Sequence, residues 1–410
     1  MMRTNHDSMD QFHQKNNGIV VANKTLSEIE HLVGHTPFYV YDRHIVQTNI
    51  NRLIKALPVK IKLHYAIKAN PYPALVHFIK PLVEGFDVAS KKEMLLALQT
   101  GMPSKEISFA GPGKTEKDIK AAIIAGITLH AESTTEISRA IAWGKKLLIK
   151  PNIAIRVNPS FELKASGMKM AGGAKPFGID EEQMPNILAQ LEYSSINFRG
   201  FHIFAGSQNL NSDAIIEMHQ KTFELAAQLV KLTPIEFDYI NIGGGLGIPY
   251  FPGDKRLDLS HISENITALI TQYSSLADID LIMELGRFLV GEAGLYVTKV
   301  IDKKTSRNTS YLVCDGGLHH HLANSGNFGQ VIRKNYPVDI GNKLECQESE
   351  YEKINIVGPL CTPLDIIADA VELPKAEIND YVVVYQSGAY GASASPKDFL
   401  SQPELSEILL

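Results

Sequence analysis

The chain of 410 residues has only three cysteines, Cys314, Cys346 and Cys361. Their spacing fits neither a zinc site nor a disulfide framework. Such sparse cysteine is typical of a reducing compartment, so we expect a cytoplasmic protein. The sequence also has no apolar run near the roughly 20 residues that cross a bilayer. Its polar N-terminus, MMRTNHDSMDQFHQKNNG, lacks the apolar segment of a secretory signal.

An excess of positive charge is missing as well. The net charge is −5 and the basic residues form no block, so we expect neither a nucleic-acid nor a membrane-surface partner. The tract His319–His321 has no second cluster at metal-ligand spacing, and we predict no metal site. The apolar fraction of 44% is that of a globular protein. The length exceeds one ordinary core and predicts about two domains.

From about residue 60 to 290, short β-rich runs alternate with segments of helical periodicity. The runs are KIKLHYAIKA (60–69), VEGFDVAS (83–90), EISFAG (106–111), ITLHAES (127–133), NIAIRVN (152–158), INFRGFHIFA (196–205), FDYINIGG (237–244) and DIDLIMELG (278–286). Eight strand–helix units predict an α/β fold of the (β/α)8 barrel type. A doubly wound parallel sheet is the alternative, but it usually contains fewer units.

Two helix starts carry N-cap signals within this region. Ser133 with Glu136 fits a capping box, whereas Thr115 is followed three residues later by Asp118 in place of Glu or Gln, so we expect no full box there.

After the barrel the helices become rare and strands bounded by Gly, Pro and Asp prevail. We therefore divide the chain into four parts. They are a polar tail (1–24), a strand region that joins the β domain (25–45), the barrel (46–290) and a mainly β C-terminal domain (291–410).

Polar and ionisable residues, together with a run of glycines, lie at the predicted C-terminal ends of the barrel strands, where barrels of this type have their active sites. They are Lys68, Asp87, Glu132, Arg156, the group 202–208, the glycines 243–245 and the group 284–287. The loop GGGLG (243–247) follows the seventh strand, and its backbone is suited to hold a phosphate. A lysine, a phosphate loop and a glutamate together indicate pyridoxal 5′-phosphate (PLP), which needs each of them.

Eight motifs in the same order carry a resemblance to a known family. They are YAIKAN, GFDVAS, RVN, GSQ, GGGLG, ELGR, GPLC and SGAYG. From about residue 35 to 400 the chain resembles the fold-type III PLP-dependent decarboxylases, which include the diaminopimelate, ornithine and arginine decarboxylases. The resemblance implies an alanine-racemase-like barrel, a carboxy-lyase activity and a homodimer with shared active sites.

The resemblance also implies roles for residues. Lys68 would form the Schiff base with PLP, Glu284 would face the ring nitrogen, and Cys361 would act from the partner subunit to protonate the substrate carbon after CO2 leaves. The further cofactor-binding residues would be Asp87, Arg156, His202, Phe204, Ser207, Gly243, Gly244, Gly245, Gly286, Arg287 and Tyr390, and the substrate-binding residues Arg287, Asp315, Thr362 and Asp365. The loop 161–180 resembles the mobile lid of the family.

Two departures from the family pattern concern the substrate. Phe204 stands where a histidine usually stacks on the cofactor ring, and phenylalanine can stack but cannot donate a hydrogen bond. Thr362 stands where the diamino-acid decarboxylases carry an Asp or Glu that binds the distal ammonium group. A neutral contact does not offset the desolvation of an ammonium group. Asp315 and Asp365 stay open as alternative amine-binding carboxylates.

The pattern GFHIFAGSQNL, GPLCTPLD and SGNFGQVIRKNYPV is most similar to the decarboxylases of exosortase and polysaccharide gene systems. It is also similar to enzymes that decarboxylate aminoacyl groups on carrier proteins, and to siderophore enzymes that act on citryl-diaminopropionate. We therefore expect an acylated or carrier-tethered amino acid as substrate and an acyl-carrier protein as a further partner. The alternatives are diaminopimelate decarboxylase, an ornithine or other diamino-acid decarboxylase, an amino-acid racemase, and an inactive relative that acts by binding.

Overall fold

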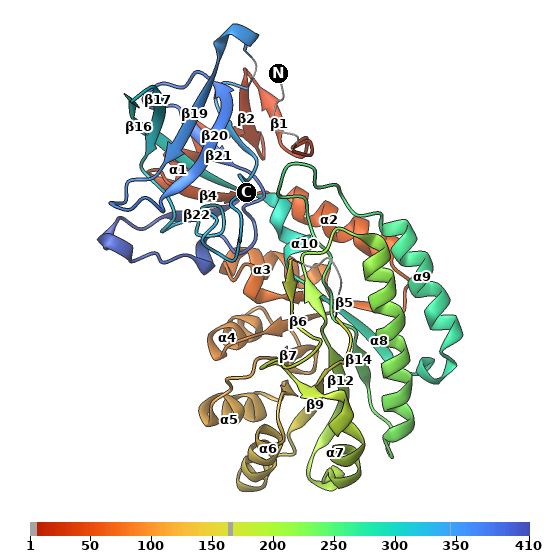
Figure 1. The fold of residues 1–410 in the computed structure, drawn as a ribbon. Coiled ribbons are helices and arrows are strands. Elements are labelled where there is room, and N and C mark those ends of the chain that lie inside the picture. The colour runs from red at the N-terminus through yellow and green to blue at the C-terminus, as the bar shows by residue number, and fades with distance from the viewer. Residues whose placement is uncertain (1–5, 163–166, 345) are drawn as a thin grey trace. The chain divides into compact units, whose positions relative to one another are not determined.

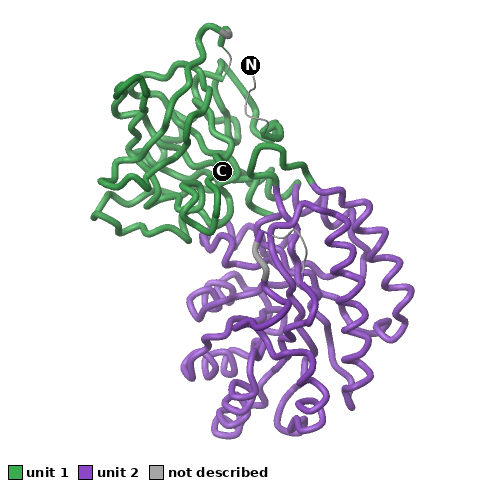
Figure 2. The backbone as a smooth tube through the Cα atoms, in the orientation of Figure 1, with its two compact units in different colours: residues 1–48, 249–256, 289–410 green, residues 49–248, 257–288 purple. Residues whose placement is uncertain are grey.

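The computed structural model describes residues 6–162, 167–344 and 346–410. The chain forms two compact units, which Figure 2 shows in different colours. Unit 1 comprises residues 1–48, 249–256 and 289–410, and unit 2 comprises residues 49–248 and 257–288. Each unit is described by itself below. Among the described residues, no helix is long and apolar enough to cross a membrane.

Unit 2 is built around a closed barrel of parallel strands. These are β5 (Ile61–Ala66), β6 (Gly85–Val88), β7 (Ile107–Phe109), β8 (Thr128–Ala131), β9 (Asn152–Asn158), β12 (Asn197–Ile203), β14 (Tyr239–Asn241) and β15 (Asp280–Leu285). Strand β15 pairs with β5 and β8 pairs with β9, which closes the sheet on itself. An open doubly wound sheet has two unpaired edges, so this closure confirms the (β/α)8 prediction.

Helices connect the strands and surround the barrel on its outer side (Figure 1). They are α3 (Pro73–Ile79), α4 (Lys91–Gln99), α5 (Glu116–Ala125), α6 (Thr134–Leu147), α7 (Met184–Gln190), α8 (Ser212–Leu232) and α9 (Leu259–Gln272). The amphipathic pattern explains their packing. In α8, for example, Ile215, Phe223 and Leu229 are buried.

The capping predictions need correction. At α5 a complete box is present, since Asp118 accepts the N–H of Thr115 at 2.9 Å and Thr115 accepts the N–H of Asp118 at 3.3 Å. Aspartate is long enough for this reciprocal bond. At α6 the side chain of Ser133 accepts the N–H of Glu136, but the carboxylate of Glu136 accepts the N–H of Glu132 at 3.0 Å instead of that of Ser133.

Unit 1 is mainly β, as expected for the C-terminal part. Its strands are β1 (His13–Lys15), β2 (Gly18–Val21), β3 (Lys24–Thr25), β4 (Phe38–Tyr41), β16 (Gly294–Ser306), β17 (Thr309–Cys314), β18 (Val338–Ile340), β19 (Tyr351–Val357), β20 (Ile366–Pro374), β21 (Tyr381–Val384) and β22 (Ser406–Leu409). Helix α1 (Leu26–Val33), the start of α2 (Arg43–Ala56) and the end of α10 (Arg287–Val290) also belong to this unit. Strand β4 pairs with β16 and β22, so a segment that precedes the barrel joins this sheet.

The polar composition of residues 1–24 predicts a tail, whereas β1, β2 and β3 form a small antiparallel sheet. Phe12, Ile19, Val20 and Val21 are buried there, so apolar side chains anchor a segment that is otherwise polar.

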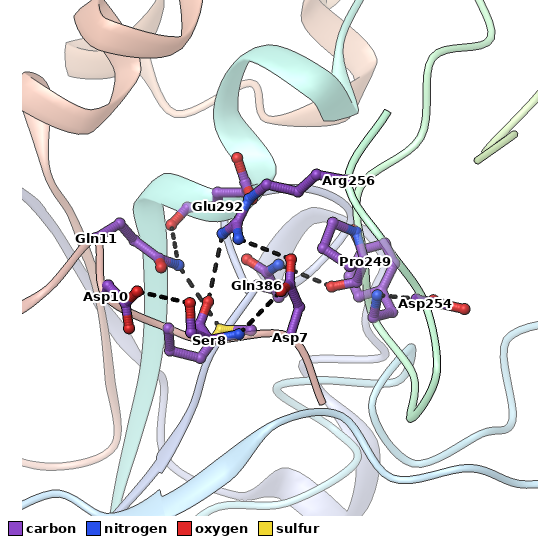
Figure 3. A network of polar contacts seen from close by, with 11 residues as sticks. Asp7, Ser8, Asp10, Gln11, Pro249, Asp254, Arg256, Glu292 and Gln386 are labelled. Atoms are coloured by element: carbon purple, nitrogen blue, oxygen red, sulfur yellow. Dashed lines mark hydrogen bonds and ion pairs between the residues drawn. The ribbon is translucent and has the colours of Figure 1, made fainter. Parts of the chain in front are cut away.

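A polar network ties three distant segments of unit 1 together (Figure 3). The guanidinium group of Arg256 donates to Asp7 at 2.7 Å and to Glu292 at 3.1 Å. Nearby, the side chain of Gln386 donates to the carbonyl of Pro249 at 2.8 Å. Through these bonds residues 249–256 belong to unit 1 although the segments before and after them belong to the barrel unit.

Candidate active site

Lys68 lies just beyond the end of β5, in a single 3-10 turn formed by Ile67–Ala69. Ile67 and Ala69 are buried, whereas the side chain of Lys68 is 43% exposed. Its Nζ atom lies 4.0 Å from Oε1 of Glu284 and 5.6 Å from the centre of the Phe204 ring. The apolar neighbours anchor the turn, and the strand thereby holds an amine at the C-terminal end of the barrel.

Glu284, at the end of β15, is the buried carboxylate that faces this amine. Its Oε2 atom accepts a hydrogen bond from the side chain of Asn241 at 3.0 Å and lies 3.2 Å from Nε2 of His202. Burial raises the pKa of Glu284, but His202 and the charge of Lys68 outweigh this and lower the pKa below its usual value. The carboxylate is therefore ionised and able to hold a proton on a partner.

Asp87, at the end of β6, is in a different state. It accepts a hydrogen bond from the hydroxyl of Ser108, and its Oδ2 atom lies 3.8 Å from Nδ1 of His64. Burial, together with the negative charge of Glu284, raises the pKa of Asp87 well above its usual value. The two carboxyl groups at this end of the barrel thus differ in charge, because ionising the second one beside the first would cost additional free energy.

Arg156, on β9, is held by Glu132, the residue that follows β8. Its Nη1 atom donates to Oε1 of Glu132 at 2.9 Å, and both side chains are buried. The guanidinium group also lies over the rings of Phe177, at 5.2 Å, and Phe204, at 6.0 Å. This ion pair fixes a cation beside the ring of Phe204 at the strand ends.

A second buried ion pair supports the first. Nζ of Lys114 lies 2.8 Å from Oε1 of Glu136, and the other oxygen of Glu136 accepts the N–H of Glu132. Sequence reasoning missed Lys114 and used Glu136 only as a helix cap. The available signal was the run GPGKT directly after β7, which places a lysine at the same strand-end rim.

The glycine loop after β14 approaches its neighbours closely. Gly243 and Gly245 have positive φ angles of 74° and 101°, and a Cβ atom on Gly244 would lie 2.0 Å from the carbonyl oxygen of Glu284. The buried N–H groups of Gly244 and Gly245 make no hydrogen bond to other described residues. Buried N–H groups need an acceptor, so this backbone fits a phosphate group.

One cavity of about 470 Å³ brings several of the predicted residues together. Lys68, Asp87, Arg156 and Glu284 line it, with the loops 88–91 and 110–114 on the same rim. Its size suits a cofactor, and its amine, carboxylate and neighbouring glycine loop are the groups that PLP requires.

Gly286 packs tightly beneath this rim, where a Cβ atom would lie 2.6 Å from that of Ala69. Ser207 is half-buried on β13 (Gly206–Ser207), which pairs with β10 (Met168–Lys169). Residues 163–166 of the expected lid lie outside the described residues. Beyond them, the N–H of Gly167 donates to Gln208 and that of Met170 to Ala205, so this part of the loop is bonded to the chain beside the GSQ motif.

The remaining candidates lie in unit 1. Cys361 is exposed with a free thiol, Thr362 is half-buried, and Tyr390 has a φ angle of 53°. Asp365 accepts the N–H groups of Leu318 at 2.6 Å and Leu360 at 2.8 Å, one on each oxygen.

Asp315 is engaged in the same way. It accepts the hydroxyl of Thr298 at 2.6 Å, the N–H of Lys299 at 2.9 Å and the hydroxyl of Thr36. Both oxygens of Asp315 and both of Asp365 thus stabilise the fold of their own unit.

The tract His319–His321 is buried in unit 1. Nε2 of His321 lies 3.0 Å from the hydroxyl of Ser387, and Nε2 of His320 lies 3.1 Å from the carbonyl of Pro403. The described residues contain no group of three or more side chains placed to hold a metal ion.

The comparisons with known proteins agree with this geometry. Residues 43–291 match the model of the pyridoxal-dependent decarboxylase, pyridoxal binding domain. The chain is 34% identical to L-glutamyl-[BtrI acyl-carrier protein] decarboxylase of Niallia circulans, over 91% of this chain and 88% of that protein. It is 31% identical to 2-[(L-alanin-3-ylcarbamoyl)methyl]-2-hydroxybutanedioate decarboxylase of Staphylococcus aureus, over 89% of this chain and 92% of that protein.

A solved structure gives the same result for the fold. Diaminopimelate decarboxylase of Methanocaldococcus jannaschii in complex with L-lysine superposes with a TM-score of 0.87 at 27% identity, over 100% of this chain and 94% of that one. The family resemblance of the motifs is therefore confirmed. The chain belongs to the pyridoxal-dependent decarboxylases, a family of carboxy-lyases, and PLP is its cofactor.

Proposed function

We propose that this enzyme decarboxylates an amino acid whose distal end is acylated or tethered to a carrier protein, such as a glutamyl group on an acyl-carrier protein. The relative from Niallia circulans, which acts on a carrier-bound glutamyl group by its name, supports this proposal. The Staphylococcus aureus relative supports it as well, since the substrate in its name carries an acylated side-chain nitrogen.

The observation that carries the proposal is the engagement of Asp315 and Asp365. A free diamino acid needs a carboxylate for its distal ammonium group, because an unpaired buried charge costs several kcal/mol. The oxygens of Asp315 and Asp365 accept hydrogen bonds from their own unit, and the residue after Cys361 is the neutral Thr362. These three positions therefore favour an uncharged distal group.

The proposed roles follow from the strand ends. Lys68 would bind the cofactor covalently through Nζ, and the ionised Glu284 would hold a proton at the ring nitrogen. Phe204 would pack against the ring, with Arg156 and His202 beside it and Asp87 near the lysine. The backbone of Gly243, Gly244, Gly245 and Gly286 would hold the phosphate, with Ser207, Arg287 and Tyr390 as further contacts.

When bound, PLP draws the electron pair that remains after CO2 leaves into its protonated ring. Glu284 keeps that ring protonated, which favours decarboxylation over chemistry that needs a weaker sink. Cys361 then donates the proton of its thiol to the substrate carbon. We propose that Cys361 and Tyr390 act from the second subunit of a homodimer, so that the exposed thiol becomes part of a closed site.

Diaminopimelate decarboxylase is the second candidate. Several relatives of that name are 27–31% identical to this chain over most of its length, including those of Aquifex aeolicus and Campylobacter jejuni. Under this alternative, Asp315 or Asp365 would have to exchange a fold-stabilising hydrogen bond for the substrate ammonium group.

The decisive experiment measures CO2 release by the PLP-loaded protein. The substrates are meso-diaminopimelate, ornithine, lysine, arginine and glutamate as free acids, and a glutamyl thioester on an acyl-carrier protein. We expect turnover with the thioester and little with the free acids. Rapid turnover of a free diamino acid would overturn the proposed substrate class.

A further inference from the structure

A second cavity, of about 440 Å³, lies at the opposite end of the barrel. We call it the floor cavity. Its rim is formed where the strands begin. The rim pairs Lys62 with Asp280, Arg199 with Asp238 at 2.7 Å and Lys105 with Glu106 at 3.5 Å, and Asp278 adds one further carboxylate. A polar rim with so small a net charge admits water but attracts an ionic ligand only weakly.

The floor cavity extends into the barrel interior, which is unusually polar. The deeper lining residues are His64, Ser108, Thr128, His130, Tyr239 and Asn241. Apolar side chains normally fill this space in a (β/α)8 barrel. Both ring nitrogens of His64 and Nδ1 of His130 are buried and have no hydrogen-bond partner within the described part of the chain. Such atoms require partners, and a polar cavity of this size can supply water.

A chain of polar groups joins the floor cavity to Glu284. The hydroxyl of Tyr239 lies 2.8 Å from Nε2 of His130, and the rings of His130 and His202 are 4.5 Å apart. Nε2 of His202 lies 3.2 Å from Glu284. On a second branch, Asn241 lines the cavity and donates directly to the same oxygen of Glu284. Glu284 itself lines the other cavity, beside Lys68.

We propose that the floor cavity is a water-filled proton path that connects Glu284 with solvent at the N-terminal end of the barrel. His130 and His202 carry the proton, and Tyr239 positions His130. The inference rests on the proposed function, because it takes Glu284 as the partner of the cofactor ring nitrogen. The path matters because the bound cofactor would cover Glu284 from the cavity at the C-terminal end, so protons need another entrance to this carboxylate.

The histidines have the right charge state for such transfer. Burial lowers the pKa of His130 and of His202, so each ring at neutral pH carries one N–H donor and one free acceptor nitrogen. Nδ1 of His130 and Nδ1 of His202 have no hydrogen-bond partner among the described residues, so a bridging water passes the proton from one ring to the other. Nε2 of His202 then releases a proton towards Glu284 while Nδ1 takes up the incoming one, and no charge stays on either ring. The other charged or titratable groups that act on Glu284 are Lys68 on the turn after β5, His64 on β5 and Asp87 on β6, and Arg156 and Lys114 act on the histidines of the path.

The test is a pH jump on the PLP-loaded protein without substrate, followed by stopped-flow absorbance of the bound cofactor in the visible range. We expect His130→Phe to slow the relaxation by about tenfold or more, in line with the usual contribution of a positioned proton donor, while the spectrum at equilibrium stays that of the wild type. His219→Phe is the matched control. His219 is also buried without partners for its ring nitrogens among the described residues, but it lies on α8 away from the floor cavity.

The outcomes separate the two proposals. Relaxation of His130→Phe at the wild-type rate overturns the proton path. If this variant does not fold or load PLP, Tyr239→Phe decides, since it removes one hydroxyl from the path; slower relaxation supports the path and the wild-type rate overturns it. In parallel, the absorbance spectrum of PLP-loaded Glu284→Gln is titrated with pH. A titration equal to that of the wild type would show that Glu284 does not face the ring nitrogen. This result would overturn the assignment of Glu284 independently of the result for His130→Phe.

Discussion

Two carboxyl groups, Asp87 and Glu284, lie at the same end of the barrel and have opposite pKa shifts. The cause is the set of neighbours. Glu284 has an amide donor, an imidazole and the amine of Lys68 around it, whereas at Asp87 burial and the negative charge of Glu284 outweigh one hydroxyl donor and the charge of Lys68. At the scale of single residues, this difference selects which carboxylate can hold a proton on a cofactor.

Asp87→Asn should stabilise the protein at neutral pH. Because the pKa of Asp87 is raised in the folded state, its protonated form favours folding below about pH 4, and this contribution is lost as the pH rises through the folded-state pKa. The amide avoids that loss. We expect the variant to unfold at a higher temperature than the wild type at pH 7.5 and at a similar temperature at pH 4, both measured without cofactor. An equal effect at both pH values would contradict the pKa assignment.

Thr362→Asp tests the substrate hypothesis from a single side chain. The new carboxylate would have to be desolvated beside an acylated, uncharged distal group. We expect turnover of the carrier-bound glutamyl thioester to fall by about tenfold or more, while cofactor absorbance is unchanged. Equal turnover in the variant would mean that residue 362 does not contact the distal group.

At the scale of elements, the glycine loop after β14 supports the site. Gly244→Ala would place a methyl group 2.0 Å from the carbonyl oxygen of Glu284, so the loop and β15 must separate. We expect a large loss of affinity for PLP, measured by fluorescence titration. Gly101→Ala is the control for a glycine replacement outside the site, because a Cβ atom at Gly101 meets nothing within 4 Å; its φ of 78° is positive whereas that of Gly244 is not, so backbone strain alone would affect the control more. An equal affinity in both variants would remove the loop from the cofactor site.

The N-terminal hydrogen bonds of α5 and α6 have different consequences for the site. Thr115→Ala should destabilise the fold by about 1 kcal/mol and leave PLP affinity unchanged, since its box bonds only to α5. Glu136→Ala should lower PLP affinity as well, because Glu136 holds both Lys114 and the backbone of Glu132, which pairs with Arg156. Chemical denaturation and PLP titration of both variants separate the two effects.

At the scale of the whole molecule, buried histidines in both units make the fold sensitive to acid. Burial lowers the pKa of His64 and His219 to about 4 and that of His321 to about 3. The unfolded chain therefore binds more protons than the folded one between these values and about 6.5, and stability falls as the pH falls through that range. We expect a clearly lower Tm at pH 5 than at pH 7.5, and a smaller difference in His219→Phe.

A shared active site can be tested with subunits that are inactive alone. Lys68→Ala and Cys361→Ala should each lose most activity, and mixing them after reversible dissociation should restore about a quarter of the wild-type value, because half of the dimers are mixed and each has one intact site. A mixture as inactive as its components would contradict the contribution of Cys361 from a second subunit.

Much of this protein was predictable from local sequence. The alternation of strand and helix patterns predicted the barrel, with a doubly wound sheet as the alternative, and the positions of Lys68, Asp87, Arg156 and Glu284 after or at the ends of their strands brought them to one cavity. The order of strands around a parallel barrel follows the order of the chain. A residue at a strand end is therefore placed by its position in the sequence alone.

Other features depended on partners that sequence patterns do not identify. The carboxylates of Asp315 and Asp365 look available in the sequence, but the backbone N–H groups of Lys299, Leu318 and Leu360 engage them in the fold. The polar barrel interior likewise arises where His64, His130 and Tyr239 converge from three strands. Local pattern determined which residues reach the active end of the barrel, whereas their hydrogen-bond partners and charge states were decided by tertiary structure, because burial and neighbouring charges exist only after distant segments meet.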